Sequence, residues 1–183
     1  HLGENMHNTQ VQEFANAVAR KATIIVVDPR YSVAASKAKY WLPIKPGTDL
    51  ALILAWMNVL VNEGLYNREF VGTWGHGFDK FVAEIKSATP EWAAQETGIE
   101  ARTIRATARE LASHRPASLV HPGRRVNWNG DDAQRSRAIA LLNALLGNYG
   151  RKGGMFVAQG VKVAPFGLPP YPKSDKPHAD GSQ

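Results

Sequence analysis

The feature of the sequence that most constrains the fold is a run of apolar and β-branched side chains at residues 22–27, which ends at Asp28. A parallel strand covered on both faces has such a continuous run, because Val, Ile and Thr favour extended backbone. Residues 9–21 precede the run and place apolar side chains at helical spacing. A helix followed by a buried strand predicts an α/β fold, namely a Rossmann-like, doubly wound and mostly parallel sheet.

Further elements alternate along the chain in the same way. Thr48 is the predicted N-cap of a helix that is apolar nearly all round, and Gly64 is its predicted end. Several short helical patterns then predict a helical insertion on the α/β core. The elements expected after the first strand are a strand, a helix, the insertion, a strand and a helix, at residues 40–44, 49–62, about 65–114, 117–121 and 131–146.

These patterns divide the chain into two parts. Residues 1–154 predict one Rossmann-like domain, which starts in the middle of its first strand–turn unit and is therefore incomplete at its N-terminus. Residues 155–183 are rich in Gly and Pro and predict an extended arm or linker. The hydrophobic content of 44% is sufficient for the domain to bury a core.

Composition excludes several kinds of site within this chain. The 183 residues contain no cysteine, so they form no disulfide, thiolate-held iron–sulfur cluster or Cys-type zinc site. The six histidines include no HxH or HxxxH pair, which makes a self-contained metal site unexpected. No apolar run is long enough to span a bilayer, and the first residues lack the pattern of a targeting signal.

The positive charge is concentrated in the second half of the chain. The net charge is +6, but residues 101–183 hold 13 basic and 5 acidic side chains, whereas residues 1–100 hold 9 and 11. The second half is therefore where an anion is attracted, and both nucleic acid and a phosphorylated cofactor are candidates.

Three loops follow the predicted strands, and a Gly-containing turn precedes the first helix. Ligands of parallel α/β sheets bind at the carboxyl ends of strands, so these segments are candidates for one crevice. A solvated turn is the alternative interpretation of each loop taken alone. The four segments are residues 3–5, 28–32, 45–49 and 123–128.

The residue types in these loops suit a nucleotide. Gly3 allows backbone amides to approach a phosphate at a helix N-terminus, and the carboxylates of Asp28 and Asp49 are acceptors for ribose hydroxyls or a guanine edge. The guanidinium groups of Arg30, Arg124 and Arg125 can contact phosphate with two hydrogen bonds each, although a solvated basic loop is the alternative for the last two. The Gly-x-Gly-x-x-Gly fingerprint of NAD sites is missing, so NAD is not the first choice.

Five motifs occur in a fixed order along the chain: Asp-Pro-Arg, Pro-Gly-Thr-Asp, Leu-Tyr-x-x-Glu-Phe-Val, Thr-Pro-Glu with Thr-Gly-Ile, and Leu-x-Gly-Asn-x-Gly-x-x-Gly-Gly. Together with Gly-Glu-Asn at the start, they resemble the third domain of the molybdopterin oxidoreductases of the dimethyl sulfoxide reductase superfamily. The resemblance extends to Gly154 and implies a molybdenum or tungsten ion held by two molybdopterin guanine dinucleotides.

The resemblance also implies roles for individual residues. No catalytic residue and no metal ligand are expected in this chain. The residues expected to contact the guanosine and pyrophosphate are Gly3, Glu4, Asn5, Met6, Asp28, Pro29, Arg30, Tyr31, Ser32, Gly47, Thr48 and Asp49. Those expected to approach the pterin and metal are Gly123, Arg124 and Trp128.

The stretch at residues 121–154 and the tail "PPYPKSDKP" are most similar to the polysulfide and thiosulfate reductase branch. Anionic sulfur substrates suit a basic loop, so Arg124 and Arg125 are candidates for substrate or anion electrostatics. A member similar to formate dehydrogenase or nitrate reductase is one alternative. A non-enzymatic basic module that binds nucleic acid or an acidic partner is another.

In this superfamily an iron–sulfur domain and the metal-ligating residue precede the third domain, and a further cofactor-binding domain follows it. The resemblance therefore implies a fragment of a catalytic subunit, inactive by itself, whose iron–sulfur cluster lies in other parts. The expected partners are the remaining domains, an iron–sulfur electron-transfer subunit and a membrane anchor subunit, and no nucleic acid. The resemblance further implies anaerobic respiration and a periplasmic location.

Overall fold

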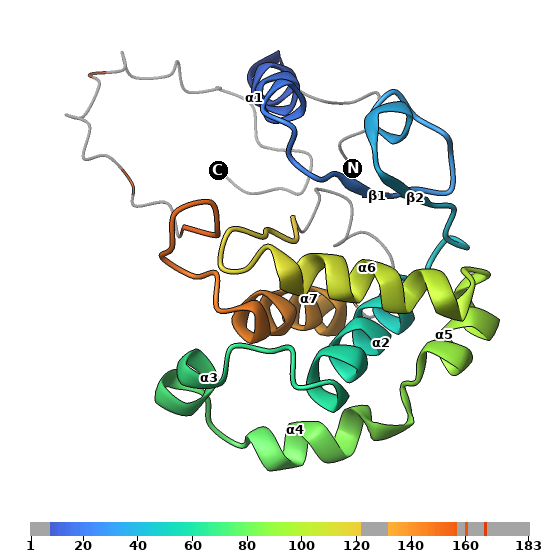
Figure 1. Cartoon of the computed structure of the whole chain (residues 1–183), viewed down its shortest axis with the longest axis vertical. Coiled ribbons are helices and arrows are strands. Elements are labelled where there is room, and N and C mark those ends of the chain that lie inside the picture. The colour runs from blue at the N-terminus through green and yellow to red at the C-terminus, as the bar shows by residue number, and fades with distance from the viewer. Residues whose placement is uncertain (1–7, 122–131, 157–159, 161–166, 168–183) are drawn as a thin grey trace, which may run out of the picture.

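The computed structural model describes residues 8–121 and 132–156, together with the single residues 160 and 167. Figure 1 shows a helix-rich molecule in which a small sheet and the first helix lie above a group of packed helices. The segments expected at residues 3–6 and 123–128, and most of the expected arm at 155–183, lie outside the described residues.

The sheet consists of two short strands in the described part of the chain. Helix α1 (Asn8–Ala19) is followed by β1 (Ile25–Val27), and the 3-10 turn η1 (Ala35–Lys37) leads into β2 (Tyr40–Leu42). The strands are parallel, and Val27 lies opposite Leu42. The expected α/β character and parallel pairing are therefore confirmed, while the wider doubly wound sheet stays a prediction.

Helix α2 (Asp49–Asn62) is the centre of the helical group, and nine of its fourteen residues are buried. Such a helix is apolar nearly all round because neighbours cover it on several sides. It packs against α5 (Pro90–Thr97), α6 (Ala101–Ser113) and α7 (Asp132–Leu146). The largest fully buried apolar side chains of the described residues are Leu42, Leu52, Met57, Leu60, Ile104, Leu142 and Leu146, so β2 contributes to the same core as the helices.

The helices between α2 and α6 begin and end where local signals predict. Asn67 caps α3 (Arg68–Trp74) by accepting a hydrogen bond from the amide of Phe70 at 2.9 Å. After α4 (Phe78–Glu84) and η2 (Ile85–Ser87), Thr89 caps α5 in the same way. Gly98 ends α5 with a φ of 76°, a left-handed conformation that glycine adopts without steric cost. Every helix in the described part of the chain is too short or too polar to cross a lipid bilayer.

The third strand expected at residues 117–121 is not formed. Residues 118–121 form neither helix nor strand, and no neighbouring strand pairs with them in the described part of the chain. The carboxamide of Asn143 on α7 instead accepts from the amide of Val120 at 3.1 Å and donates to its carbonyl at 3.0 Å. The prediction was wrong because a side chain supplies the hydrogen bonds that a strand would have supplied.

Candidate functional site

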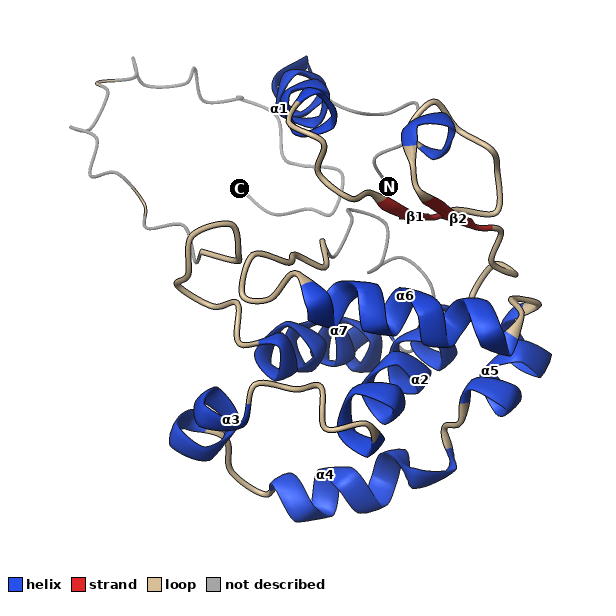
Figure 2. Cartoon of the chain, viewed as in Figure 1, coloured by secondary structure: helices blue, strands red, loops and turns tan. Residues whose placement is uncertain are grey.

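The candidate site lies where the two parallel strands end. The register places Val27 opposite Leu42, so the loops that follow β1 and β2 leave the same edge of the sheet. These loops carry residues 28–32 and 43–48, and they are the tan segments that continue from the red strands in Figure 2. The structure thus brings two of the four predicted segments to one edge.

Asp28 is built into the first loop by three hydrogen bonds. Its carboxylate Oδ1 accepts from the amide of Arg30 at 2.9 Å, its amide donates to Leu42 at 3.2 Å, and its carbonyl accepts from the indole of Trp41 at 2.9 Å. The side chain closes a local turn, as Asp often does in loops. Asp28 is only 5% exposed, and no other hydrogen bond to its carboxylate occurs among the described residues.

The remainder of this loop presents an aromatic surface. Tyr31 is 61% exposed and packs edge-to-face on Trp41, with ring centroids 4.9 Å apart. Ser32 is buried, and its hydroxyl accepts from the amide of Ala35 at 3.3 Å, which holds the start of η1. Trp41, which the sequence places only within the strand expected at residues 40–44, lies on the candidate site beside Asp28 and Tyr31. The position of Trp41 beside Asp28 follows from the pairing of β1 with β2, which the local sequence does not show.

The second loop leads into the N-terminus of α2. Gly47 has a φ of 85°, which favours glycine. Thr48 stands at the N-cap position, but its hydroxyl donates to the carbonyl of Lys45 at 2.7 Å and caps no amide of α2. The predicted N-cap position is therefore confirmed, but the side chain makes no cap bond, because the hydroxyl finds a partner within the preceding turn. Half-buried Asp49 lies in the first turn of α2.

In this arrangement the first amides of α2 lack hydrogen-bond acceptors in the described part of the chain. The amides of Ala51 and Leu52 donate to the carbonyl of Thr48, whereas those of Asp49 and Leu50 have no acceptor among the described residues. Free amides and the positive end of the helix dipole favour an anion, although the charge of Asp49 offsets part of this field.

The other two predicted segments cannot be placed. Gly3, Glu4, Asn5 and Met6, and likewise Gly123, Arg124, Arg125 and Trp128, lie outside the described residues. His121 is the last described residue before the second of these segments, and burial lowers the pKa of its imidazole.

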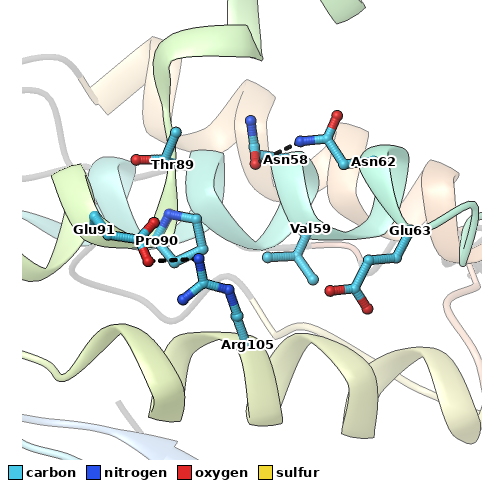
Figure 3. A pocket seen from close by; sticks show the side chains of 8 residues that line it. All are labelled: Asn58, Val59, Asn62, Glu63, Thr89, Pro90, Glu91 and Arg105. Carbon is cyan, nitrogen blue, oxygen red and sulfur yellow. Dashed lines mark hydrogen bonds and ion pairs between the residues drawn. The ribbon is translucent and has the colours of Figure 1, made fainter.

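A hollow of about 240 Å³ opens elsewhere, between α2, α5 and α6 (Figure 3). Its charged groups are already paired: Glu91 contacts Arg105 at 2.6 Å, and Glu63 contacts Arg109 at 2.8 Å. These hydrogen bonds hold the pKa of each carboxyl below its usual range. None of the predicted site residues lines this hollow, so it is separate from the candidate site.

No group of three or more His, Cys, Asp or Glu side chains is placed to hold a metal ion among residues 8–121 and 132–156. The described residues of the candidate site therefore offer carboxylate, hydroxyl, amide and guanidinium groups for binding a polar ligand.

Comparison with known protein families defines the class of protein. The molybdopterin oxidoreductase family matches residues 2–168, and the chain belongs to that family. The resemblance found in the sequence is thereby confirmed.

Several known proteins are similar to most of this chain, but the matched region is only a small part of each of those proteins. The molybdopterin-containing subunit of thiosulfate reductase from Salmonella typhimurium is 36% identical over 162 residues, which are 88% of this chain and 21% of that protein. The corresponding subunit of arsenate respiratory reductase from Chrysiogenes arsenatis is 35% identical over 86% of this chain and 21% of its own.

The solved structure of acetylene hydratase from Pelobacter acetylenicus superposes with a TM-score of 0.77 at 31% identity. The superposition covers 84% of this chain and 22% of that one. The chain therefore spans about a fifth of the length of the relatives it matches.

Proposed function

We propose that this chain binds one guanine dinucleotide of a bis(molybdopterin guanine dinucleotide) cofactor through the loops that follow β1 and β2. The observation that carries the proposal is the parallel register, which sends residues 28–32 and 43–48 from the same edge of the sheet. In this proposal the two strands are part of a Rossmann-like doubly wound sheet, in which nucleotides bind at strand ends.

The described groups fit such a ligand. The buried carboxylate of Asp28 accepts one amide hydrogen bond, and Asp49 adds a second carboxylate, so both can accept from guanine N–H groups or ribose hydroxyls. The open amides of Asp49 and Leu50 suit pyrophosphate oxygens, as does the guanidinium of Arg30. Gly3, Glu4, Asn5 and Met6 complete the proposed site from the sequence. The bound metal supplies the redox chemistry, while these residues hold and orient the dinucleotide.

For the parent enzyme we propose the reduction of thiosulfate, polysulfide or a related sulfur compound. The 36% identity to a thiosulfate reductase subunit supports this choice, as does the predicted basic pair Arg124 and Arg125. Relatives named arsenate reductase, dimethyl sulfoxide reductase and acetylene hydratase are the competing assignments. The proposed partners are the remaining catalytic domains, an iron–sulfur subunit and a membrane anchor, with the assembly in the periplasm.

Calorimetric titration of this chain with GDP and ADP tests the binding proposal. Asp49→Asn removes one carboxylate from the first turn of α2, and Asp79→Asn makes the same change in the first turn of α4, far from the site loops in the sequence. We expect GDP to bind more tightly than ADP. Of these two variants, only Asp49→Asn should weaken the binding of GDP, by about ten-fold, because a charged hydrogen bond is lost.

Asp28→Asn is a second variant for the same titration, because an amide oxygen can still accept from the amide of Arg30 while the charge is removed. Equal binding of GDP and ADP, or equal affinities in all variants, contradicts the proposal. A parallel titration uses single-stranded DNA at two salt concentrations. DNA binding that depends steeply on salt and shows no guanine preference would favour the basic binding module instead.

A further inference from the structure

The outer face of α7 carries no negative charge over residues 133–146. The exposed residues in this range are Ala133, Gln134, Arg137, Ala140 and Leu141. The sequence from 133 to 156 contains no Asp or Glu at all. A helix face that is exposed to solvent usually carries charged side chains, with both signs interspersed. The outer face of α7 is therefore unusual for a surface that only contacts water.

The basic side chains of α6 and of the α7 region differ in their partners. Each arginine of α6 forms an ion pair with a glutamate, and the pairs are Arg102–Glu100, Arg105–Glu91 and Arg109–Glu63. Arg137, Arg151 and Lys152 are also exposed, but none of them forms an ion pair in the described part of the chain. The positive charge around α7 is therefore not neutralised there, and it attracts an anionic partner.

The turn that follows α7 has a fixed backbone. The carbonyl of Asn148 accepts from the amide of Met155, and the amide of Gly154 donates to the carbonyl of Arg151, both at 2.9 Å. Asn148 is 0% exposed, and a Cβ atom at Gly154 would overlap its carbonyl oxygen. Arg151 and Lys152 thus stand on a backbone that is ordered before any partner arrives, which lowers the entropic cost of binding.

Tyr149 joins this turn to the outer face of α7. Its hydroxyl donates to the carbonyl of Ala140 at 3.2 Å, directly before Leu141, which is 40% exposed. Its ring stacks on Phe70 of α3, with the ring centroids 6.4 Å apart. Arg137 lies one helical turn before Leu141 and therefore on the same side of α7. The turn and this side of the helix thus form one surface.

Exposed apolar side chains accompany the basic ones on this surface. Phe156 is 66% exposed and follows Met155, whose backbone pairs with that of Tyr149. Protein–protein interfaces are enriched in aromatic residues and arginine. Figure 1 shows the turn after α7, in orange, at the end of the helical group away from α5. We call this set of residues the α7 surface: Arg137, Leu141, Tyr149, Arg151, Lys152 and Phe156.

We propose that the α7 surface docks an acidic protein segment that carries leucine or aromatic side chains. Carboxylates of the segment pair with the three basic side chains, while its apolar side chains cover Leu141 and Phe156. Single-stranded nucleic acid fits less well, because its bases stack on open aromatic faces and the ring of Tyr149 already packs on Phe70. No residue of the α7 surface belongs to the strand-end loops, so this inference does not depend on the proposed function.

Fluorescence anisotropy of a labelled peptide tests the docking surface with the full 183-residue chain. The peptide contains glutamate, leucine and phenylalanine. One control peptide has serine in place of leucine and phenylalanine, and a second has lysine in place of glutamate. We expect the first peptide to bind most tightly, with an affinity that falls as salt is added. Equal affinities for the three peptides, or no binding of the first, overturn the proposal.

Two double variants test the role of the charges. Arg151→Gln with Lys152→Gln removes two positive charges from the α7 surface, and Lys80→Gln with Lys86→Gln removes two from exposed lysines of α4 and η2. Only the first double variant should weaken the acidic peptide, by about five-fold. An equal loss in both double variants would show that the peptide responds to net charge alone and would overturn the proposal.

A second pair of variants tests the apolar contact. Leu141→Gln changes a side chain that is 40% exposed on α7, and Val11→Gln changes one that is 43% exposed on α1. Only Leu141→Gln should weaken the acidic peptide, again by about five-fold, and equal effects contradict the proposal. Single-stranded DNA is the competing probe. If DNA binds more tightly than the peptide and loses affinity in the Arg151 and Lys152 double variant, the surface binds nucleic acid and the proposal is overturned.

Discussion

In the proposed site, Asp28 combines a structural role with a binding role. Its main chain joins β2 at Leu42 and receives the indole N–H of Trp41, and its carboxylate closes the turn at Arg30. Because the amide of Arg30 holds the carboxylate before any ligand arrives, the proposed binding should cost little rotamer entropy at Asp28. The edge-to-face contact of Trp41 with Tyr31 extends this fixed surface.

Trp41→Phe tests how much the hydrogen bond from the indole of Trp41 to Asp28 contributes to stability. Phenylalanine keeps an aromatic ring beside Tyr31 but loses the indole donor, so the free energy of unfolding should fall by about 1 kcal/mol. Urea denaturation measures the change. Trp74→Phe is the control, because Trp74 is 76% exposed, and its effect should be close to zero. Equal effects of the two substitutions would show that the bond contributes nothing.

The elements show which local signals were sufficient for prediction. The Thr-Pro start and Gly end of α5 are local signals, because the cap bond and the left-handed residue depend on neighbours within the same turn. The position of Trp41 and the bonding of residues 118–120 are not local, because they depend on residues 13 or more positions away. The strand propensity of residues 117–121 did not predict that side chains of Asn143 and Asn148 would bind this segment.

The threonines at the N-cap positions of α2 and α5 predict different losses of stability when each is replaced by alanine. Thr89 accepts from the amide of Trp92 at 3.2 Å, whereas Thr48 caps no amide. Thr89→Ala should lower the free energy of unfolding by about 1 kcal/mol, the usual value for a lost N-cap. Thr48→Ala should cost less, since only the bond to Lys45 is removed from an exposed turn. Thermal or urea unfolding of both variants makes the comparison, and the reverse order would contradict it.

At the scale of the whole molecule, an ion pair joins the sheet to the helices. Nζ of Lys39, directly before β2, donates to both carboxylate oxygens of Glu110 on α6, at 2.9 and 2.8 Å. The side chain of Glu110 is 15% exposed. The hydrogen bond from Lys39 holds the pKa of the Glu110 carboxyl below its usual range, against the opposing effect of burial. The contact therefore depends on pH.

Glu110 should contribute to acid sensitivity. Because its folded pKa lies below the unfolded value of 4.5, its contribution is present above that pH and is lost as the pH falls through the folded pKa. Glu110→Gln should therefore flatten the loss of stability between about pH 5 and about pH 3. Urea midpoints across this range measure the slope. Equal slopes in wild type and Glu110→Gln would contradict the assignment.

The central claim is that the dinucleotide binds at the strand ends and not in the hollow between the helices. The most direct measurement is a map of backbone amide chemical shifts during titration of the chain with GDP. We expect the shifts to concentrate at residues 28–32 and 47–50, with saturation at a common dissociation constant. Shifts concentrated instead at Asn58, Glu91 and Arg105, which line the hollow in Figure 3, would contradict the account.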